Sequence, residues 1–293
     1  MVQPKRLSEK AMLVQLSISY WTARKLDREV TERANEDFQA QSDAGRYNKL
    51  MLGKQRLQGI QQAVTAARIC HYRMTLPWNN EGTRILPSAM FWDYSEQMRK
   101  CADQFQTAKA ELVANYPAYV AESRKRLGRM FRPEEYPAAG EIGGKFQFSV
   151  MTFPLPEAGD FRVDLGDEQV DRIRKEIEQS IKETVGRGTK ELWARLHECV
   201  AHMAERLGDS EAIFRDSLVE NLAELVALLP KLNLADDPEL KQMQEHIEKK
   251  LLQHTANDLR ENKAARRDTA QAAKNMAEKM AGYAGIPLDN QPI

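Results

Sequence analysis

The chain has 293 residues, and its 43 lysines and arginines balance 43 aspartates and glutamates, so the formal net charge is +0. A hydrophobic content of 42% is too high for a wholly disordered protein, and charged residues interrupt every stretch long enough to span a bilayer. The composition predicts a soluble globular protein with long solvated helices, arranged in one large or two smaller domains.

The cysteines and the N-terminus indicate the cellular compartment. Cys70, Cys101 and Cys199 lie far apart in the sequence, which is poor material for a disulfide framework. The first ten residues are polar and basic and are followed by no apolar segment of the signal-peptide type. We therefore expect reduced thiols and a cytoplasmic protein.

The first third of the chain predicts one strand and two helices. Apolar and polar residues alternate over residues 13–20, which indicates a strand with one face in water. Charges then become denser, and a helix is expected to begin near Trp21 and to turn Leu26 inward. A loop is expected over residues 39–47. Helical spacing of apolar residues predicts the next helix over residues 50–72.

The strongest periodicity follows a group of turn residues at 77–87, which are expected to form a loop. After Ser88, a plausible N-cap, large apolar residues recur every seven positions and predict a long helix with a coiled-coil-like seam. The seam consists of Phe91, Met98, Phe105, Leu112 and Tyr119, with Tyr94, Cys101 and Ala108 between them. The spacing fits a helical hairpin within one chain and a coiled coil between chains equally well. Pro117 is expected to kink or break the helix, because it removes one backbone hydrogen bond.

Two further alternations predict the rest of a small sheet. Residues 133–144 are rich in proline and glycine and indicate a long connection. Residues 145–153 then alternate, with Phe148 and Val150 on one face, and residues 161–165 alternate again after a turn. These two strands form a predicted hairpin. Together with the strand at 13–20 they make a three-stranded antiparallel sheet.

Beyond residue 166 the pattern is helical throughout. Gly186 and Gly188 predict a hinge between two helices, and Ser210 is expected to cap a new one. Asp237, followed by a first-turn proline, predicts the start of a helix that continues past Leu259.

These elements predict an α+β fold that is mainly α with a small antiparallel sheet, long amphipathic helices and coiled-coil-like packing. We expect a helical body with the sheet over residues 1–207, followed by a C-terminal helical region over residues 210–293.

No catalytic, cofactor-binding or metal-binding motif emerges, so the sequence predicts neither an enzyme nor a cofactor. His197 and His202 are five positions apart, which places them about 140° apart around a helix and unable to share one metal ion. The segment from Gly186 to Lys190 lacks the glycine spacing and the preceding strand of a phosphate-binding loop.

Two basic clusters provide the candidate nucleic-acid-binding residues. The first is Arg124, Lys125, Arg126, Arg129 and Arg132, and the second is Arg260, Lys263, Arg266 and Arg267. They would form an interface if Trp78, Tyr116, Tyr119 and Phe131 were exposed for base stacking. The simpler interpretation is that the arginines lie on solvated faces and that the rings belong to the core.

Several segments carry a resemblance to a known family. They are Arg84-Ile-Leu-Pro-Ser-Ala, Asn115-Tyr-Pro-Ala-Tyr-Val, Pro133-Glu-Glu-Tyr-Pro, Phe146-Gln-Phe-Ser-Val and Gly159-Asp-Phe-Arg-Val-Asp-Leu, together with the opening Leu13-Val-Gln-Leu-Ser-Ile-Ser. Over roughly residues 10–207 the chain resembles an uncharacterised family of bacterial and phage proteins. Members are often encoded beside a MoxR-type AAA ATPase or among phage DNA-metabolism genes.

The resemblance implies a phage or mobile-element origin, the cytoplasm of a bacterial host, and an AAA ATPase partner or a part in DNA processing. It transfers no catalytic residue. From the long helices we expect a homo-oligomer that acts as a self-assembling or partner-binding scaffold without catalysis. The alternative is a protein that binds single-stranded or duplex DNA in phage replication or recombination.

Overall fold

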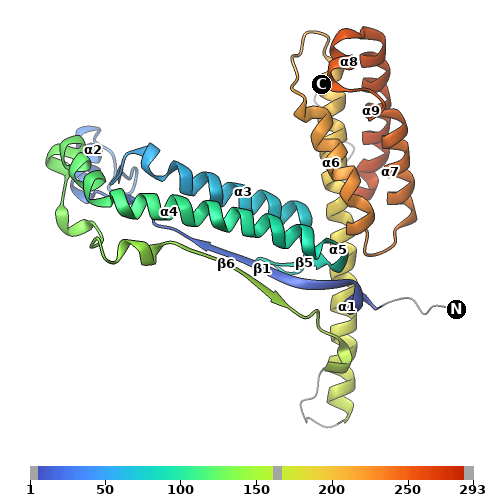
Figure 1. The fold of residues 1–293 in the computed structure, drawn as a ribbon, viewed down its shortest axis with the longest axis horizontal. Helices are drawn as coiled ribbons and strands as arrows, with labels where there is room; N and C mark the ends of the chain where they lie inside the picture. Colours follow the sequence, from blue (N-terminus) through green and yellow to red (C-terminus); the bar gives the residue numbers. More distant parts are fainter. Residues whose placement is uncertain (1–5, 161–166, 287–293) are drawn as a thin grey trace. The chain divides into compact units, whose positions relative to one another are not determined.

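The computed structural model describes residues 6–160 and 167–286, and it is mainly α with a small antiparallel sheet, as predicted (Figure 1). The chain divides into two compact units. Unit 1 contains the described parts of Met1–Gln15, Tyr72–Trp92 and Thr152–Ile293, and unit 2 contains Leu16–His71 and Asp93–Met151. Each unit therefore combines segments that are distant in the sequence, and the boundary expected between residues 207 and 210 stays a prediction.

The strands are β1 Ala11–Ser19, β2 Arg24–Leu26, β3 Asn48–Leu50, β4 Leu76–Pro77, β5 Thr83–Pro87 and β6 Gln147–Phe153. Four of them form one sheet in the order β4-β5-β1-β6, while β2 and β3 pair separately. The strands predicted at 13–20 and 145–153 are confirmed. The strand predicted at 161–165 lies outside the described residues.

The expected loop at 77–87 is wrong in its second half, because β5 pairs antiparallel with β1, with Leu13 opposite Ile85. Its residues Arg84–Pro87 are all buried, so the strand shows no alternation of apolar and polar residues. Arg84 adds a buried charged residue to the strand, which the apolar pattern of a buried strand does not predict. The turn between β4 and β5 does contain the expected turn residues, and Gly82 has a φ of 87°.

The helices are α1 Leu7–Lys10, α2 Arg28–Asp37, α3 Gln58–Met74, α4 Phe91–Leu127, α5 Asp167–Gly208, α6 Ser217–Leu232, α7 Pro238–Lys250, α8 Ala256–Glu261 and α9 Lys263–Ala284. Short 3-10 turns are η1 Lys54–Leu57, η2 Ser88–Met90, η3 Gly128–Met130, η4 Pro133–Glu135, η5 Ile142–Lys145 and η6 Ala158–Asp160. None of the described helices is long and apolar enough to cross a membrane.

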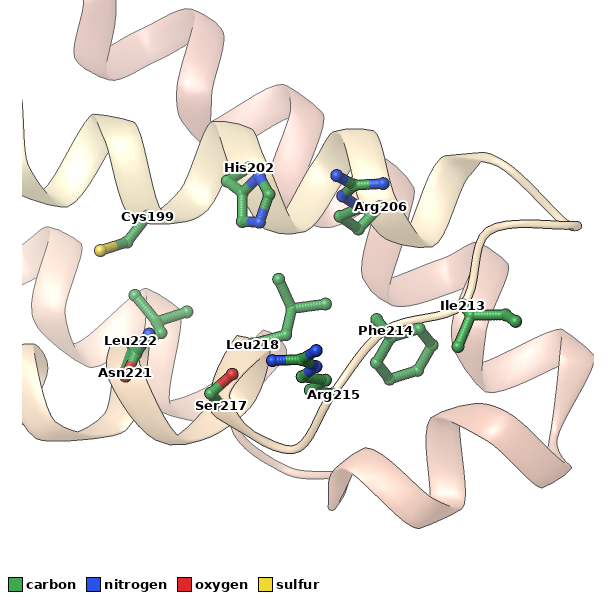
Figure 2. Close-up of a pocket in the computed structure, with 10 residues that line it drawn as sticks. All are labelled: Cys199, His202, Arg206, Ile213, Phe214, Arg215, Ser217, Leu218, Asn221 and Leu222. Atoms are coloured by element: carbon green, nitrogen blue, oxygen red, sulfur yellow. The ribbon is translucent and has the colours of Figure 1, made fainter. Parts of the chain in front are cut away.

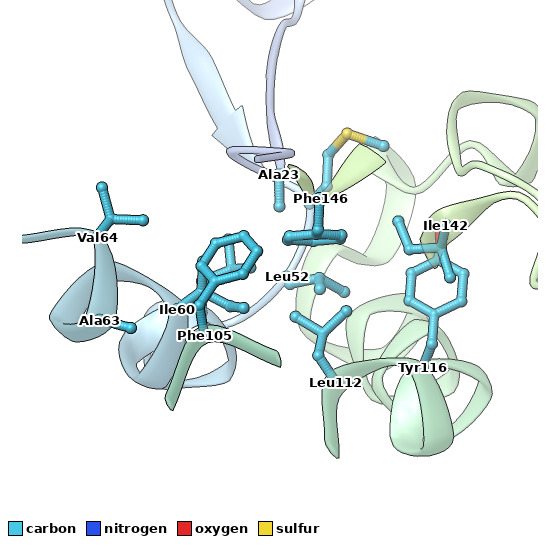
Figure 3. Close-up of a cluster of buried hydrophobic side chains, with 12 residues drawn as sticks. Ala23, Leu52, Ile60, Ala63, Val64, Phe105, Leu112, Tyr116, Ile142 and Phe146 are labelled. Carbon is cyan, nitrogen blue, oxygen red and sulfur yellow. The ribbon is translucent and has the colours of Figure 1, made fainter. Parts of the chain in front are cut away.

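The central part of the predicted seam of α4, which includes Phe105 and Leu112, is buried inside unit 2, whereas Phe91 is half-buried and belongs to unit 1. Phe105, Leu112 and Tyr116 pack with Ile60 of α3 and with Phe146 in one apolar cluster (Figure 3). The Phe105 ring is fully buried, and its centroid lies 5.7 Å from that of Phe148 on β6. The seam is therefore filled by residues of the same chain, which is the helical-hairpin alternative and not the intermolecular coiled coil.

Two expectations for unit 2 are wrong. No helix begins at Trp21, because β2 intervenes and Asp27 caps α2 by accepting a hydrogen bond from the Val30 N–H at 3.2 Å. Leu26 is consequently exposed. The expected break at Pro117 does not occur either, since Pro117 lies inside the continuous helix α4.

Unit 1 is built on α5, against which α6 and α9 pack (Figure 1). The hinge predicted at Gly186 and Gly188 is wrong, because α5 continues through both. A Cβ atom on Gly188 would lie 3.3 Å from Cδ1 of Leu76, so the glycine allows β4 to approach the helix closely.

The helices after α5 begin and end at other residues than expected. A loop precedes α6, which starts at Ser217 and not at Ser210. Asp237 caps α7 as predicted, through hydrogen bonds from the Glu239 and Leu240 N–H groups. The expected continuation past Leu259 is wrong, because α7 ends at Lys250 and a capping box starts α8.

Candidate functional site

The first basic cluster lies at the C-terminal end of α4 in unit 2. All five of its side chains, Arg124, Lys125, Arg126, Arg129 and Arg132, are exposed. The first three occupy the last turn of α4, where cations are stabilised by the negative end of the helix dipole. Stabilisation of the helix end is therefore sufficient to explain why Arg124, Lys125 and Arg126 are basic.

Three members of the cluster also have partners within unit 2. Arg126 donates a hydrogen bond to the backbone oxygen of Leu50, and Arg132 pairs with Glu29 at 2.8 Å. Arg124 lies over the Phe131 ring at 5.8 Å. Within residues 6–160 and 167–286, neither Lys125 nor Arg129 has an ion-pair partner, so these two cations are the most available to an external anion.

The aromatic residues proposed for base stacking do not form an open platform. Tyr116 is buried and donates a hydrogen bond to the Pro137 backbone oxygen at 2.9 Å. Tyr119 lies under the Arg56 guanidinium, and the Phe131 ring packs on Tyr136 with centroids 5.1 Å apart. Trp78, the fourth, is half-buried and belongs to unit 1. The rings of Tyr116, Tyr119 and Phe131 therefore serve packing in unit 2, and Trp78 does not lie in the same unit.

The second basic cluster belongs to unit 1, and two of its members act structurally. Arg266 donates hydrogen bonds to backbone oxygens of the segment that ends α5 and follows it, those of Arg206, Leu207, Asp209 and Ala212. Arg260 donates to the backbone oxygen of Phe214 at 3.1 Å and pairs with Asp216 at 2.5 Å. Lys263 and Arg267 remain exposed on α9.

The loop held by Arg260 and Arg266 forms one wall of a groove of about 310 Å³ between α5 and the start of α6 (Figure 2). The α5 side supplies Cys199, His202 and Arg206, and the opposite side supplies Ile213, Phe214, Arg215, Ser217, Leu218, Asn221 and Leu222. The lining contains two arginines and a histidine but no carboxylate. The groove therefore has a positive polar part beside an aliphatic part.

The side chains of the groove are not arranged for nucleophilic catalysis or metal binding. Burial raises the pKa of the Cys199 thiol, and Glu198 raises it further, so the thiol is protonated at neutral pH. On the same helix, burial lowers the pKa of His197, which favours the neutral ring. The described residues contain no group of three or more His, Cys, Asp or Glu that could hold a metal ion.

A buried charge cluster in unit 2 escaped the sequence analysis. Lys49 of β3 has a side chain that is 1% exposed, and its Nζ lies 3.0 Å from Asp27 and 2.7 Å from Glu135. The same Nζ donates a hydrogen bond to the Met130 backbone oxygen at 2.9 Å. One ammonium group thus joins β3, the start of α2 and the segment that follows α4.

The pKa directions agree with a charged cluster. Burial lowers the pKa of Lys49, but the hydrogen bonds to Glu135 and Asp27 raise it more, and the result is a raised pKa. Burial raises the pKa of Asp27, whereas the hydrogen bonds from Lys49 and from the Val30 N–H lower it more, and the result is a lowered pKa. Lys49 is therefore a fully paired structural cation and not a free nucleophile.

The two predicted basic clusters lie in different units, the first in unit 2 and the second in unit 1. The structure reveals the α5–α6 groove in addition. No protein-family model, curated protein or solved structure matches this chain. The only sequence signals for the groove were Arg206 and Arg215, which lie among many other charged residues of the helical region.

Proposed function

We propose that this chain is a self-assembling helical scaffold in which the outer edge of β6 pairs with β6 of a second copy. The proposal is supported by one observation, the difference between the two edges of the four-stranded sheet. An exposed strand edge offers unpaired backbone groups to another chain, and proteins normally protect such edges with proline, charge, short length or a covering helix.

The β4 edge has this protection. The strand consists of two residues and ends in Pro77, and α5 packs against it. The β6 edge lacks the protection that proline, charge or short length would give. The strand Gln147–Phe153 has seven residues and contains no charge, proline or glycine. No other strand among the described residues pairs with its outer edge.

A two-fold antiparallel pairing centred on Val150 suits this sequence. Phe148 would lie opposite Thr152 of the second copy, and Ser149 opposite Met151, so no charges face each other. Met151 and Phe153 are each 41% exposed and would be partly covered. The same surface serves both copies, as a closed dimer requires.

The solution mass tests this proposal. Wild-type protein is expected to have the mass of a dimer or higher oligomer in light scattering. The double variant Ser149→Lys, Met151→Lys places like charges opposite each other and is expected to be monomeric, because the changed side chains are exposed and the fold is spared. Mixing it with Ser149→Glu, Met151→Glu should restore the dimer. A monomeric wild type, or a lysine variant of unchanged mass, contradicts the proposal.

A second candidate is DNA binding by the acid-free segment 124–132, supported by the exposure of Lys125 and Arg129. Because the rings proposed for stacking are packed inside their units, phosphate contacts would dominate. Filter binding at about 50 and 200 mM salt should then show a steep loss of affinity. The variant Arg124→Ala, Lys125→Ala, Arg126→Ala should abolish binding. Equal retention of DNA by this variant would exclude the segment.

A further inference from the structure

We infer that the groove between α5 and α6 in unit 1 binds an acidic peptide segment, in which a carboxylate lies beside an aliphatic side chain. The groove and β6 share no residue, so this site is separate from the proposed self-assembly. Its positive charge, its rigid wall and its aliphatic lining each favour such a ligand.

The two arginines of the groove, unlike its histidine, lack a carboxylate partner in the described part of the chain, since His202 Nδ1 lies 3.9 Å from Glu205. Among the described residues, no carboxylate forms an ion pair with the side chain of Arg206 or Arg215, and both are exposed. Other arginines of unit 1 behave differently, since Arg84 pairs with Glu191 at 3.0 Å and Arg260 with Asp216 at 2.5 Å. Two arginines that line one groove without an ion-pair partner among the described residues can bind carboxylate groups.

The wall of the groove is fixed before any ligand arrives. Phe214 is 6% exposed, and the guanidinium groups of Arg260 and Arg266 each lie 5.2 Å from its ring centroid. The hydrogen bonds of these two arginines to loop carbonyls hold the same segment. A preformed wall reduces the entropy lost on binding.

The remaining lining favours a peptide over a nucleotide. The accessible aliphatic part of the groove consists of Ile213, which is 93% exposed, and Leu218, which is 9% exposed, while Leu222 lines the groove but is fully buried (Figure 2). The ring of Phe214 is occupied by two arginines and offers no free face for a base. Ser217 and Asn221 add neutral groups that suit a peptide backbone. A volume of about 310 Å³ accepts one or two side chains.

The probe is a short fluorescein-labelled peptide of alternating glutamate and leucine, and its binding to the full chain is followed by fluorescence anisotropy. Arg206→Gln, Arg215→Gln is expected to weaken binding by about tenfold or more, because the charge-assisted hydrogen bonds from both guanidinium groups to the peptide carboxylates are lost. The matched control is Lys263→Gln, Arg267→Gln, which removes two exposed charges from the same unit and should change the affinity by less than about twofold.

Cys199 reports where the peptide binds, since it lines the groove while Cys70 and Cys101 are buried elsewhere. Bound peptide should slow the alkylation of Cys199 by N-ethylmaleimide, measured by mass spectrometry. Binding without this protection, or equal weakening in the control variant, would overturn the inference. Displacement of the peptide by inorganic phosphate at equal concentration would likewise overturn it, because the site would then recognise a simple anion.

Discussion

Within each unit, long helices pack against one another, but the side chains at the helix interface of unit 1 differ from those at the helix interface of unit 2. In unit 2, α3 and α4 meet through rings and branched aliphatic residues such as Phe105 and Ile60. In unit 1, α9 packs along α5 through buried alanines, including Ala273, Ala277 and Ala281. In unit 2 Phe105 fills space between helices, although Gly59 and Ala108 also meet there, whereas in unit 1 the alanines of α9 allow its backbone to approach α5. The Phe105 site should therefore be the more sensitive to truncation, and the Ala273 site to enlargement.

The polar anchors of the units differ as well. Unit 2 depends on the buried ammonium group of Lys49 between two carboxylates. Unit 1 uses Arg266 on backbone oxygens and the stacked pair Trp193 and Tyr283, with ring centroids 4.5 Å apart. Loss of the single buried cation should thus be more damaging than loss of one of several distributed contacts in unit 1.

Phe105→Ala is expected to have the largest effect, destabilising unit 2 by about 3–5 kcal/mol through the cavity it leaves. Native-state hydrogen exchange of α4 peptides measures this loss. Phe38→Ala is the control, because the Phe38 side chain is 85% exposed and its removal should change the stability by less than about 0.5 kcal/mol. A similar cost for the two variants would show that the seam is not the core of unit 2.

Lys49→Met should destabilise unit 2 by about 3–5 kcal/mol, because the carboxylates of Asp27 and Glu135 lose the buried cation that lies between them. Lys25→Met is its control. The Lys25 side chain is 49% exposed, and its Nζ is 3.9 Å from Glu135, so its loss should be worth at most about 1 kcal/mol. Equal losses, read from the urea midpoint, would contradict a central role for Lys49.

The same variant should weaken one pH dependence of stability. In the wild type the folded-state pKa of Asp27 lies below its ordinary value of 3.8, so its contribution to stability is present above that pH and disappears as the pH falls through the lowered pKa. In Lys49→Met the hydrogen bond from the Val30 N–H remains and still lowers the pKa of Asp27, but the hydrogen bond and the charge of Lys49 are lost, so this pKa rises relative to the wild type. The stability of that variant should therefore decrease less on acidification than that of the wild type. Urea midpoints between about pH 5 and pH 3 would show the shallower slope.

Ala273→Leu should destabilise unit 1 by about 1–3 kcal/mol, since the buried alanine leaves no space for added methylene groups. Lys274→Leu is the matched control, at an exposed neighbouring position with nearly the same helix propensity. Exchange of α9 amides should increase in the first variant and not in the second. If Ala273→Leu stabilised unit 1, the close-packed interface would be refuted.

Asp237→Ala is expected to have the smallest effect, about 1 kcal/mol, from the lost N-cap of α7. The Trp193 Nε1–H group, which donates to Asp237 at 3.1 Å, also loses its acceptor. Asp237→Asn keeps a capping oxygen and should recover most of the stability in thermal unfolding. No difference between the two variants would mean that the cap contributes little.

Local patterns were sufficient for much of the fold. The alternation around Val150 predicted β6, the seven-residue repeat through Phe105 predicted α4, and the Asp237-Pro238 pair predicted the start of α7. Each signal is contained in a few neighbouring residues, which share one periodicity or one cap. The α5–α6 groove had no comparable signal, because its lining comes from two helices and a loop whose spacing is not periodic.

The sequence by itself determined most of the helical segments and the strands β1 and β6, since hydrophobic period and capping act over a few residues, but it did not determine β5. Tertiary structure decided what the ambiguous residues do. Gly188 signalled flexibility in isolation, but the approach of Leu76 makes it a packing position. Arg260 and Arg266 signalled phosphate binding, yet backbone oxygens of a distant loop engage them. The partner of a charge or of a small residue is fixed by contacts between segments remote in sequence, which local periodicity does not encode.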